Sequence, residues 1–356
     1  MRLMIAGGGT GGHLFPGVAI AEELRARDPQ ATIRFVGTAR GIEARVLPEL
    51  GEDLALIEVS GLKTVGAWGA IKGVFRLPRA LWQAQRIVKQ FKPDAVVGVG
   101  GYASGPVVLM ARLCGVPTAI CEQNSIPGLT NKILGKFARA VFLSFEESRR
   151  FFKPKKIVMS GNPVRRDLVQ KLLDAKSEPS ETFHVLVSGG SLGAVAVNDL
   201  AAHALGTLAK EHPIAITHQT GEKGLEATRA IYAKTRVVAE CSAFIKDMAA
   251  AYARADLIIG RAGATTVAEL AIAGKPAIFI PYPFAADNHQ EINAREMAQA
   301  GAALSFKQAD LTAEKLVDIL RPLLAPARRS EMAAAMKALA KPHAAAAVVD
   351  WCLEQT

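Results

Sequence analysis

Residues 2–27 read RLMIAGGGTGGHLFPGVAIAEELRAR, an apolar run that enters a glycine-rich turn and continues as a helical pattern. Residues 2–6 are predicted to form a buried strand, and the pattern after His13 predicts a helix to about Arg27. A second apolar run, residues 183–187, enters Ser188-Gly189-Gly190-Ser191-Leu192-Gly193 and another helical pattern. The same strand, turn and helix therefore start two similar Rossmann-like units.

Short apolar runs alternate with helical segments along the whole chain. This alternation predicts parallel sheets with right-handed crossovers. It breaks at residues 153–163, where one further short strand is expected. We therefore predict an α/β protein of two Rossmann-like domains, residues 1–162 and 163–341, whose sheets face each other across a cleft. An alanine-rich tail, 332–353, is expected to form one or two helices broken near Pro342. The predicted strands are 2–6, 32–36, 54–59, 94–99, 117–121, 140–143, 183–187, 214–218, 235–239, 256–259, 276–280 and 302–305.

Composition excludes several classes of protein. Half of the 356 residues are hydrophobic and 21% are charged, which excludes a disordered chain. The four cysteines show no C-x-x-C spacing, so neither a disulfide framework nor structural zinc is expected. The N-terminus reaches glycine too early for a secretion signal, and the uncharged residues 95–111 contain four glycines and a proline. These features predict a cytoplasmic protein with no membrane-spanning helix.

Charge is concentrated in one part of the chain. The net charge is +10, and residues 59–92 contain seven cations and no acid. Basic residues mixed with large apolar ones favour docking on an anionic membrane surface. An ordinary amphipathic helix with a solvated basic face is the alternative, and no motif supports nucleic-acid binding. The residues concerned are Lys63, Lys72, Arg76, Arg79, Arg86, Lys89 and Lys92, with Trp68, Ile71, Val74, Phe75, Leu77 and Trp82.

The first glycine turn satisfies G-x-G-x-x-G, but no acid lies between Asp28 and Glu43 to hold a nicotinamide dinucleotide's ribose. Arg40 would suit an NADP phosphate. A phosphate-binding turn at a helix N-terminus is better supported, and a tight turn without a ligand is the alternative. His13 closes this turn, where it would act as a general base or as a simple hydrogen-bonding residue.

Polar residues follow several other predicted strands. The turn at 189–193 is a second candidate anion site, and Glu122-Gln123-Asn124 is expected to face a ligand. Glu269 would lie one helical turn after Arg261-Ala262-Gly263, where its two oxygens suit a ribose diol. Amide side chains in 281–293 suit sugar hydroxyls. Capped or polar helix starts explain the last two segments equally well. No Asp-x-Asp occurs, so helix N-termini and arginine, rather than a metal, would neutralise a diphosphate leaving group.

Taken in order, these segments resemble the MurG family of bacterial UDP-N-acetylglucosamine transferases. The resemblance runs along nearly the whole chain. It implies a GT-B fold with the helix 342–356 packing back on the first domain. It also implies inverting transfer of N-acetylglucosamine, without metal or cofactor, to the C4 hydroxyl of lipid I, a polyprenyl diphosphate. The expected location is peripheral, on the cytoplasmic face of the membrane. The motifs are 8–13 (GGTGGH), 100–106 (GGYASGP), 122–124 (EQN), 161–165 (GNPVR), 189–193 (GGSLG) and 261–269 (RAGATTVAE).

The resemblance also assigns site residues. Thr10, Gly11 and Gly12 are linked to the acceptor diphosphate, and His13 is the proposed base, with Glu122 as the other candidate. Asn124 and Gln290 would hold sugar hydroxyls. Ala268 replaces a serine frequent in the family. The remaining donor contacts would be Ser191 (phosphate), Ile245 (uracil, through its backbone), Arg165 (nucleotide), Arg261 (leaving group) and Ala264, Thr265, Thr266, Val267, Ala268 and Glu269, with Glu269 on the ribose.

Three other functions compete with this interpretation. A UDP-N-acetylglucosamine 2-epimerase of the same fold would use the same nucleotide site without an acceptor. An NADP oxidoreductase and a non-catalytic peripheral membrane protein are the other two.

Overall fold

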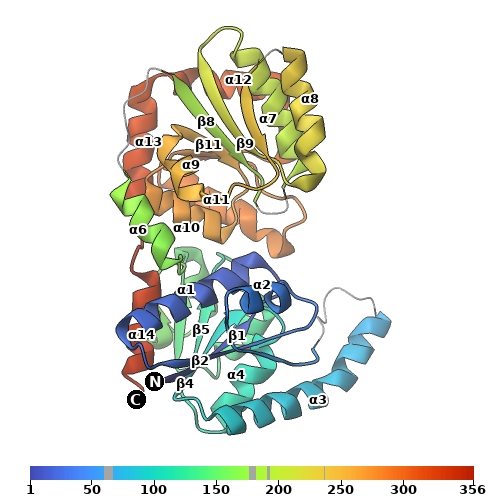
Figure 1. Cartoon of the computed structure of the whole chain (residues 1–356), viewed down its shortest axis with the longest axis vertical. Helices are drawn as coiled ribbons and strands as arrows, with labels where there is room; N and C mark the ends of the chain where they lie inside the picture. The colour runs from blue at the N-terminus through green and yellow to red at the C-terminus, as the bar shows by residue number, and fades with distance from the viewer. Residues whose placement is uncertain (60–66, 176–181, 191–192, 236) are drawn as a thin grey trace. The chain divides into compact units, whose positions relative to one another are not determined.

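The chain forms two compact units (Figure 1). The computed structural model describes residues 1–59, 67–175, 182–190, 193–235 and 237–356, with backbone alone for 67–76. Unit 1 comprises Met1–Arg166 and Pro342–Thr356, and unit 2 comprises Asp167–Lys341. The chain thus passes from unit 1 to unit 2 after Arg166, whereas the sequence pattern placed the domain boundary after residue 162. Val164 is buried, and Arg165 Nε donates to Glu22 Oε1 at 3.1 Å, which ties this segment to unit 1.

Unit 1 contains a parallel sheet in the order β3-β2-β1-β4-β5-β6-β7. Helix α14 packs against α1, and its Val348, Val349 and Cys352 join the apolar cluster around Leu14 and Val18. The strands are β1 (Arg2–Gly7), β2 (Thr32–Gly37), β3 (Leu54–Leu56), β4 (Ala95–Gly100), β5 (Thr118–Glu122), β6 (Ala140–Leu143) and β7 (Ile157–Val158). The helices are α1 (Gly11–Arg27), α2 (Glu43–Glu49), α3 (Ala67–Phe91), α4 (Ser104–Leu113), α5 (Leu129–Leu134) and α14 (Ala344–Leu353).

Unit 2 contains a parallel sheet in the order β10-β9-β8-β11-β12-β13. Its core gathers Val185, Val187, Leu257 and Ile259 from the central strands and Leu205 from α7. The strands are β8 (Phe183–Ser188), β9 (Ile214–Gln219), β10 (Ala239–Ser242), β11 (Leu257–Gly260), β12 (Ala277–Phe279) and β13 (Ala303–Ser305). The helices are α6 (Arg166–Asp174), α7 (Val195–Leu208), α8 (Leu225–Thr235), α9 (Met248–Arg254), α10 (Ala264–Ala273), α11 (His289–Gln299), α12 (Ala313–Leu320) and α13 (Pro326–Ala338).

The two sheets share one topology. In each, the first strand lies in the middle, and the strand order reverses beside it, between β1 and β4 and between β8 and β11. Open parallel sheets bind ligands at the carboxyl ends of the strands, where the order reverses. Both predicted glycine turns follow these first strands. The predicted α/β fold with two parallel sheets is therefore confirmed, and each glycine turn lies at the carboxyl edge of its sheet, beside the reversal of strand order.

One predicted strand, residues 235–239, is largely wrong. Helix α8 extends to Thr235, and β10 begins only at Ala239. The Thr235 hydroxyl donates to the carbonyl of Tyr232 at 3.0 Å, and Val238 is 91% exposed. Local side-chain bonding and exposure thus outweigh the strand preference of these β-branched residues. The strand predicted at 54–59 ends at Leu56, and the break near Pro342 is confirmed by the separate helices α13 and α14.

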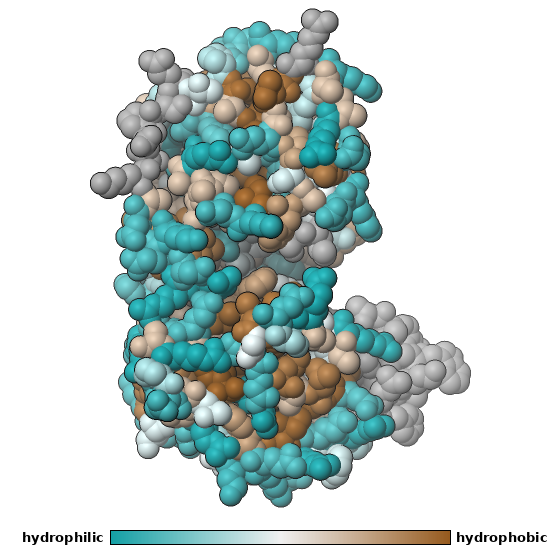
Figure 2. Space-filling model, viewed as in Figure 1, coloured by the Kyte–Doolittle hydropathy of each residue, from teal (hydrophilic) through white to brown (hydrophobic). Residues whose placement is uncertain are grey.

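The surface of unit 1 shows brown, apolar residues between hydrophilic side chains (Figure 2). Residues 95–111, which lack charge, form β4 and most of α4, both largely buried. Along the described stretches of the chain, no helix combines the length and apolar character needed to cross a bilayer.

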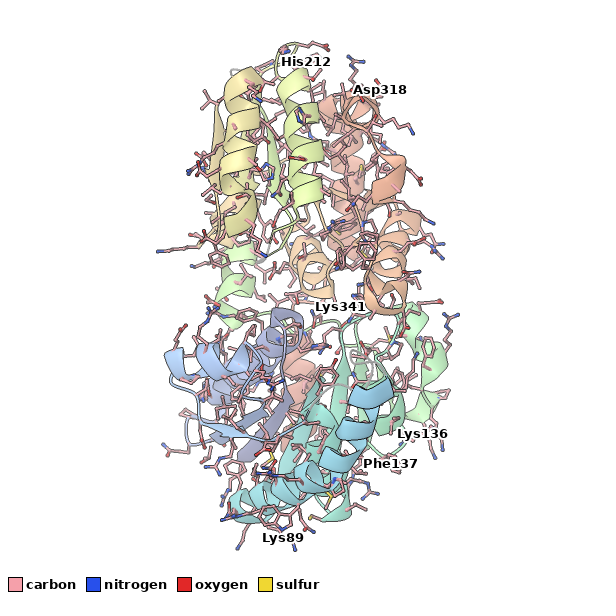
Figure 3. All side chains as sticks on the ribbon, turned by 90° about the vertical axis from the view of Figure 1, so that its right-hand side faces the viewer. Lys89, Lys136, Phe137, His212, Asp318 and Lys341 are labelled. Carbon is pink, nitrogen blue, oxygen red and sulfur yellow. The ribbon has the colours of Figure 1, made fainter. Side chains whose placement is uncertain are left out.

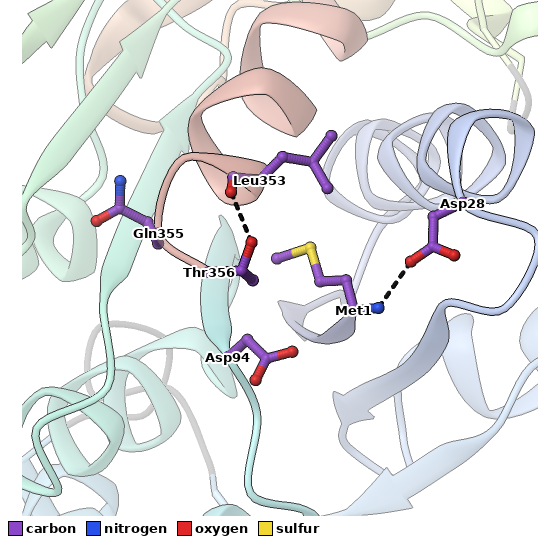
Figure 4. A pocket seen from close by; sticks show the side chains of 6 residues that line it. All are labelled: Met1, Asp28, Asp94, Leu353, Gln355 and Thr356. Carbon is purple, nitrogen blue, oxygen red and sulfur yellow. Dashed lines mark hydrogen bonds and ion pairs between the residues drawn. The ribbon is translucent and has the colours of Figure 1, made fainter.

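A pocket of 440 Å³ lies in unit 1 where the two chain ends meet (Figure 4). The N-terminal ammonium of Met1 pairs with Asp28 at 2.7 Å there. Met1 and Asp94 directly precede β1 and β4, so this pocket lies at the amino edge of the sheet. It is therefore separate from the carboxyl edge that carries the predicted site residues. Its lining residues are Met1, Asp28, Asp94, Leu353, Gln355 and Thr356.

Candidate functional site

The first glycine turn has a backbone that only glycine adopts easily. Gly7, Gly8 and Gly9 have φ of 153°, 139° and 91°. A Cβ on Gly7 would clash with the carbonyl oxygen of Gly100, and Gly8 N donates to that oxygen at 3.3 Å. The turn is thereby attached to the end of β4, and α1 starts at Gly11. The first N–H groups of α1 have no intrahelical acceptor, so they are available to an anion.

His13 lies against the end of β4. A Cβ on Gly100 would lie 2.5 Å from the Cδ2 atom of the imidazole, so glycine makes room for the ring. Thr10 Oγ1 lies 3.3 Å from His13 Nδ1. The structure thus brings together Thr10, Gly11, Gly12 and His13 at the carboxyl edge of the unit 1 sheet.

Glu122 organises the loop that follows β5. It is 3% exposed, and its Oε1 accepts from Asn124 N at 3.0 Å. Its Oε2 accepts from Asn131 Nδ2 at 2.8 Å and from Gly128 N at 3.3 Å. Burial raises the pKa of Glu122 to about 7, and these hydrogen bonds oppose the shift. The carboxyl can therefore carry or release a proton near neutral pH, while it fixes the backbone of Asn124, a half-buried residue.

The second glycine turn is connected to Ile245 by a residue that the sequence did not single out. Gln219, at the end of β9, donates from Nε2 to the carbonyl of Gly190 at 3.0 Å. Its Oε1 accepts from Ile245 N at 2.9 Å, so Gln219 connects the second glycine turn to the backbone of Ile245. Gly193 N donates to Gly190 O at 3.0 Å and closes the turn. Ser191, the predicted phosphate ligand, lies outside the described residues.

Helix α10 begins one residue after Gly263, so its N-terminus lies at the carboxyl edge of the unit 2 sheet. Ala264 and Val267 are buried and pack inward, which leaves their backbone as the part that can meet a ligand. Thr265, Thr266, Ala268 and Glu269 are half-buried.

Glu269 has a defined partner inside unit 2. The Tyr252 hydroxyl, from α9, donates to Glu269 Oε2 at 2.8 Å. Burial raises the pKa of Glu269 to about 7, and the tyrosine bond opposes this by favouring the carboxylate.

Arg261 supports the loop after β12 in this structure. Its Nη1 donates to the carbonyls of Ile280 and Pro281, both at 2.9 Å, and its guanidinium carbon lies 5.5 Å from the centre of the Tyr282 ring. Tyr282 N in turn donates to Gln290 Oε1 at 3.0 Å. Arg261 is therefore a support of the segment that leads to Gln290, and burial lowers the pKa of its guanidinium.

Asn124 is a predicted donor contact that belongs to unit 1, and so is Arg165. Arg165 forms an ion pair with Glu22 of α1 at 3.1 Å. The other described donor residues belong to unit 2. In the part of the chain that the structure describes, no group of three or more His, Cys, Asp or Glu side chains is arranged to hold a metal ion.

Sequence reasoning missed two supporting residues, Gln219 and Tyr252. Gln219 ends a strand, so the rule that selected Glu122 applies to it equally. Tyr252 lies in an alanine-rich helix and carries no signal, because its role depends on the packing of α9 beside α10.

Comparison with known proteins places both units in one family. Residues 3–143 match the glycosyltransferase family 28 N-terminal domain, and residues 184–348 match the glycosyltransferase family 28 C-terminal domain. A protein of Myxococcus xanthus (strain DK1622) is 49% identical over 99% of this chain and 93% of its own length. One of Geobacter sp. (strain M21) is also 49% identical, over 98% of this chain and 95% of its own. Both are named UDP-N-acetylglucosamine–N-acetylmuramyl-(pentapeptide) pyrophosphoryl-undecaprenol N-acetylglucosamine transferase.

Comparison with solved structures points to the same family. The crystal structure of Acinetobacter baumannii MurG has a TM-score of 0.84 and 36% identity, with 99% of each chain covered. A UDP-GlcNAc 2-epimerase from Neisseria meningitidis, bound to UDP-GlcNAc, has a TM-score of 0.72 at 13% identity over 99% of this chain and 100% of its own, so it shares the fold alone. The chain therefore belongs to the MurG family within glycosyltransferase family 28 and is a glycosyltransferase of the GT-B fold.

Proposed function

We propose that this protein transfers N-acetylglucosamine from UDP-N-acetylglucosamine to the C4 hydroxyl of N-acetylmuramyl-(pentapeptide) pyrophosphoryl-undecaprenol, the lipid I of peptidoglycan synthesis. The observation that carries the proposal is 49% identity, over 99% of the chain, to proteins named for this reaction. Two glycine turns at the strand-order reversals of the two sheets agree with a reaction between two phosphorylated substrates.

Unit 2 is the proposed donor half. Glu269 Oε1 would accept from a ribose hydroxyl while Tyr252 holds Oε2. The carbonyl of Ile245 would accept from the uracil N–H, because Gln219 occupies the N–H of Ile245. Ser191 and the N–H groups at the start of α10, from Ala264 to Thr266, would surround the diphosphate.

Unit 1 is the proposed acceptor half. The acceptor diphosphate would bind the N–H groups of Gly11 and Gly12, with the Thr10 hydroxyl beside them. The acceptor C4 oxygen attacks the anomeric carbon as the bond from that carbon to the β-phosphate oxygen breaks. UDP leaves with that electron pair, and the hydroxyl proton passes to His13 or Glu122. Attack from the opposite side inverts the anomeric centre.

No metal is invoked in this mechanism. The charge that develops on UDP would be stabilised by hydrogen-bond donors already in place, namely Ser191, the α10 N-terminus and Arg261. Loss of one such donor typically lowers the rate on the order of 10²-fold. Arg261 would also act by holding the loop of Gln290.

Unit 1 offers a surface suited to an anionic membrane. In the described part of α3, Leu77 and Trp82 are exposed, and the Arg86 guanidinium lies over the Trp82 ring at 5.8 Å. Arg79 is partly neutralised, since it pairs with Glu58 at 2.8 Å. Helices α3, α4 and α5 pack in succession, and Lys136 and Phe137, labelled in Figure 3, directly follow α5 in the chain. Exposed apolar residues continue this surface at Leu113, Leu129, Ile133 and Phe137, with Arg112, Lys132, Lys136, Lys153, Lys155 and Lys156 nearby in the chain.

This membrane surface would let the chain reach a lipid acceptor from the face of the bilayer. We propose peripheral attachment at the cytoplasmic face. Replacement of Lys132 and Lys136 by Gln should weaken binding to anionic vesicles at low salt. The same substitutions at Lys210 and Lys234 of unit 2 serve as the control.

The decisive experiment measures UDP release from UDP-N-acetylglucosamine in EDTA, with and without a lipid I analogue. Release that depends on the analogue, with formation of the disaccharide product, supports the proposal. Release without acceptor, accompanied by a changed sugar at C2, would instead identify a 2-epimerase. The epimerase is less supported, because the similarity to epimerase structures lies at 13–15% identity, where only the fold is shared.

A further inference from the structure

A buried carboxylate lies against the first glycine turn. Glu43, the first residue of α2, is 1% exposed. Its Oε2 accepts from Gly9 N at 2.7 Å, and its Oε1 accepts from Thr38 N at 2.9 Å and from the Thr38 hydroxyl at 3.0 Å. The family motifs that we used to identify the site do not include this residue.

Three glycines make room for this carboxylate. A Cβ on Gly8 would clash with the carboxyl carbon of Glu43, and a Cβ on Gly41 would clash with its oxygens. A Cβ on Gly37 would lie 2.5 Å from Glu43 Cγ. These glycines come from three segments: the β1–α1 turn, the end of β2 and the loop before α2. The site for the carboxylate is therefore built by the fold, and its charge is balanced by three donors and the N-terminus of α2.

The bond to Gly9 fixes the conformation of the turn. Gly9 has φ of 91°, and its N–H points inward to Glu43. The carbonyl oxygen of the next residue, Thr10, accepts from His13 N at 3.2 Å and from Leu14 N at 3.1 Å. The Thr10 hydroxyl lies 3.3 Å from His13 Nδ1. Glu43 thus holds Gly9, the residue before Thr10, and Thr10 in turn contacts the start of α1 and the candidate base.

This arrangement also divides the backbone N–H groups of the turn into those bonded to the protein and those open to a ligand. Gly8 N is used by Gly100 and Gly9 N by Glu43, so neither is available to a substrate phosphate. The N–H groups of Gly11 and Gly12 lie in the first turn of α1, where no intrahelical acceptor exists. The protein's own anion therefore occupies the inner end of the turn, and the outer end is left for the acceptor.

We propose that Glu43 is a positioning residue that holds the first glycine turn in the conformation that binds the acceptor diphosphate and aims His13. The proposal rests on the proposed transfer to lipid I. Glu43 is buried in unit 1 and bonds to the first glycine turn, so its effect should fall on the acceptor half-reaction and spare binding of the nucleotide by unit 2.

The test compares Glu43→Gln with Glu52→Gln, a matched control. The Glu52 carboxylate is also largely buried in unit 1 and accepts two bonds from Arg25, both at 2.6 Å, but it does not contact the turn. The Glu43→Gln side chain keeps the shape of the glutamate, but its NH2 group must face a backbone N–H, so that one hydrogen bond is lost. We expect kcat/KM for a lipid I analogue to fall about tenfold or more in Glu43→Gln. UDP affinity should stay unchanged, and Glu52→Gln should alter thermal stability alone.

Two further measurements keep the proposal testable. Thr38→Val removes only the hydroxyl bond to Glu43, so it should shift acceptor kinetics in the same direction by less, even if Glu43→Gln does not fold. Amide hydrogen exchange of a peptide covering residues 7–14 should be faster in Glu43→Gln than in Glu52→Gln.

The outcomes separate this proposal from the proposed function. Unchanged acceptor kinetics in Glu43→Gln and Thr38→Val, with lowered stability alone, would make Glu43 a fold-stabilising residue and overturn the proposal. If the wild-type protein transferred no sugar to the analogue, the proposed function would fail. The exchange measurement would then still decide on Glu43, because equal exchange of residues 7–14 in the two variants would overturn its positioning role.

Discussion

Removal of the Tyr252 hydroxyl should change the pH dependence of UDP binding. In the structure this hydroxyl donates to Glu269 Oε2 at 2.8 Å, and Glu269 has a pKa of about 7 because it is buried. The bond favours the ionised carboxyl, so its loss in Tyr252→Phe must raise the pKa further. The ionised form is the better acceptor for a ribose hydroxyl. UDP affinity should therefore rise with pH, and Tyr252→Phe should need a higher pH than the wild type to reach the same affinity.

The size of the shift follows from the strength of one hydrogen bond to an ionised acceptor. Such a bond contributes about 1.5–3 kcal/mol, and one pKa unit corresponds to about 1.4 kcal/mol, so the pKa of Glu269 should rise by about 1 unit or more. At pH 7.5 a group with a pKa of about 7 is about three-quarters ionised, and one with a pKa of 8 about one-quarter ionised. We therefore expect UDP to bind about threefold more weakly at this pH.

Calorimetric titration with UDP from pH 6 to pH 9 measures both midpoints. Glu269→Gln is the control, because it keeps the side-chain shape and retains only the titration of the UDP phosphate, whose pKa is about 6. The midpoint of the Tyr252→Phe curve, after this correction, should lie above that of the wild type. Equal midpoints, or affinity that falls as the pH rises, would refute the role of Glu269 at the ribose or that of Tyr252 beside it.

Three other predictions concern residues of both units. Glu122 has a pKa raised from 4.5 to about 7, so the folded state holds the proton more tightly, and the contribution of Glu122 to the free energy of unfolding should fall by about 2.5 kcal/mol from pH 5 to pH 8. Urea denaturation should show that the advantage of wild type over Glu122→Gln shrinks as the pH rises, and a constant difference would contradict the shift. His13→Ala should lower turnover on the order of 10²-fold or more, with UDP affinity unchanged, and near-normal turnover would exclude His13 as the base. Gln219→Ala should weaken UDP binding about tenfold, measured by calorimetry, because two hydrogen bonds that link the turn to Ile245 are lost; wild-type affinity would exclude this link.

The sequence predicted the fold because its signals are local. Apolar runs, glycine turns and helical periodicity all occur within a few residues, and they gave both sheets and both ligand-binding edges. Residues 235–239 show the limit of such signals. The β-branched residues there predict a strand, but the hydroxyl of Thr235 bonds to the last turn of α8, and the side chain of Val238 has no core to enter.

The candidate site was predictable where a residue follows a strand directly. Glu122 and Asn124 were found in this way, and His13 was found because it closes the glycine turn after the first strand. The supporting contacts were not, because each depends on packing between elements that are distant in sequence. Glu43 lies 34 residues from Gly9, and Tyr252 lies 17 residues from Glu269. No spacing rule connects such pairs, and only the assembled sheet with its covering helices brings them within hydrogen-bond distance.

The path of the chain through its two units has a consequence for synthesis. Unit 2 is one continuous stretch, whereas unit 1 needs residues on both sides of it. A chain made from its N-terminus can therefore complete unit 2 while unit 1 still lacks α14. Until Val348, Val349 and Cys352 have been synthesised and have packed, the apolar side of α1 that they cover is exposed to solvent. The half that is synthesised first is thus the last to finish folding, and this interval is when the nascent protein most needs protection from aggregation.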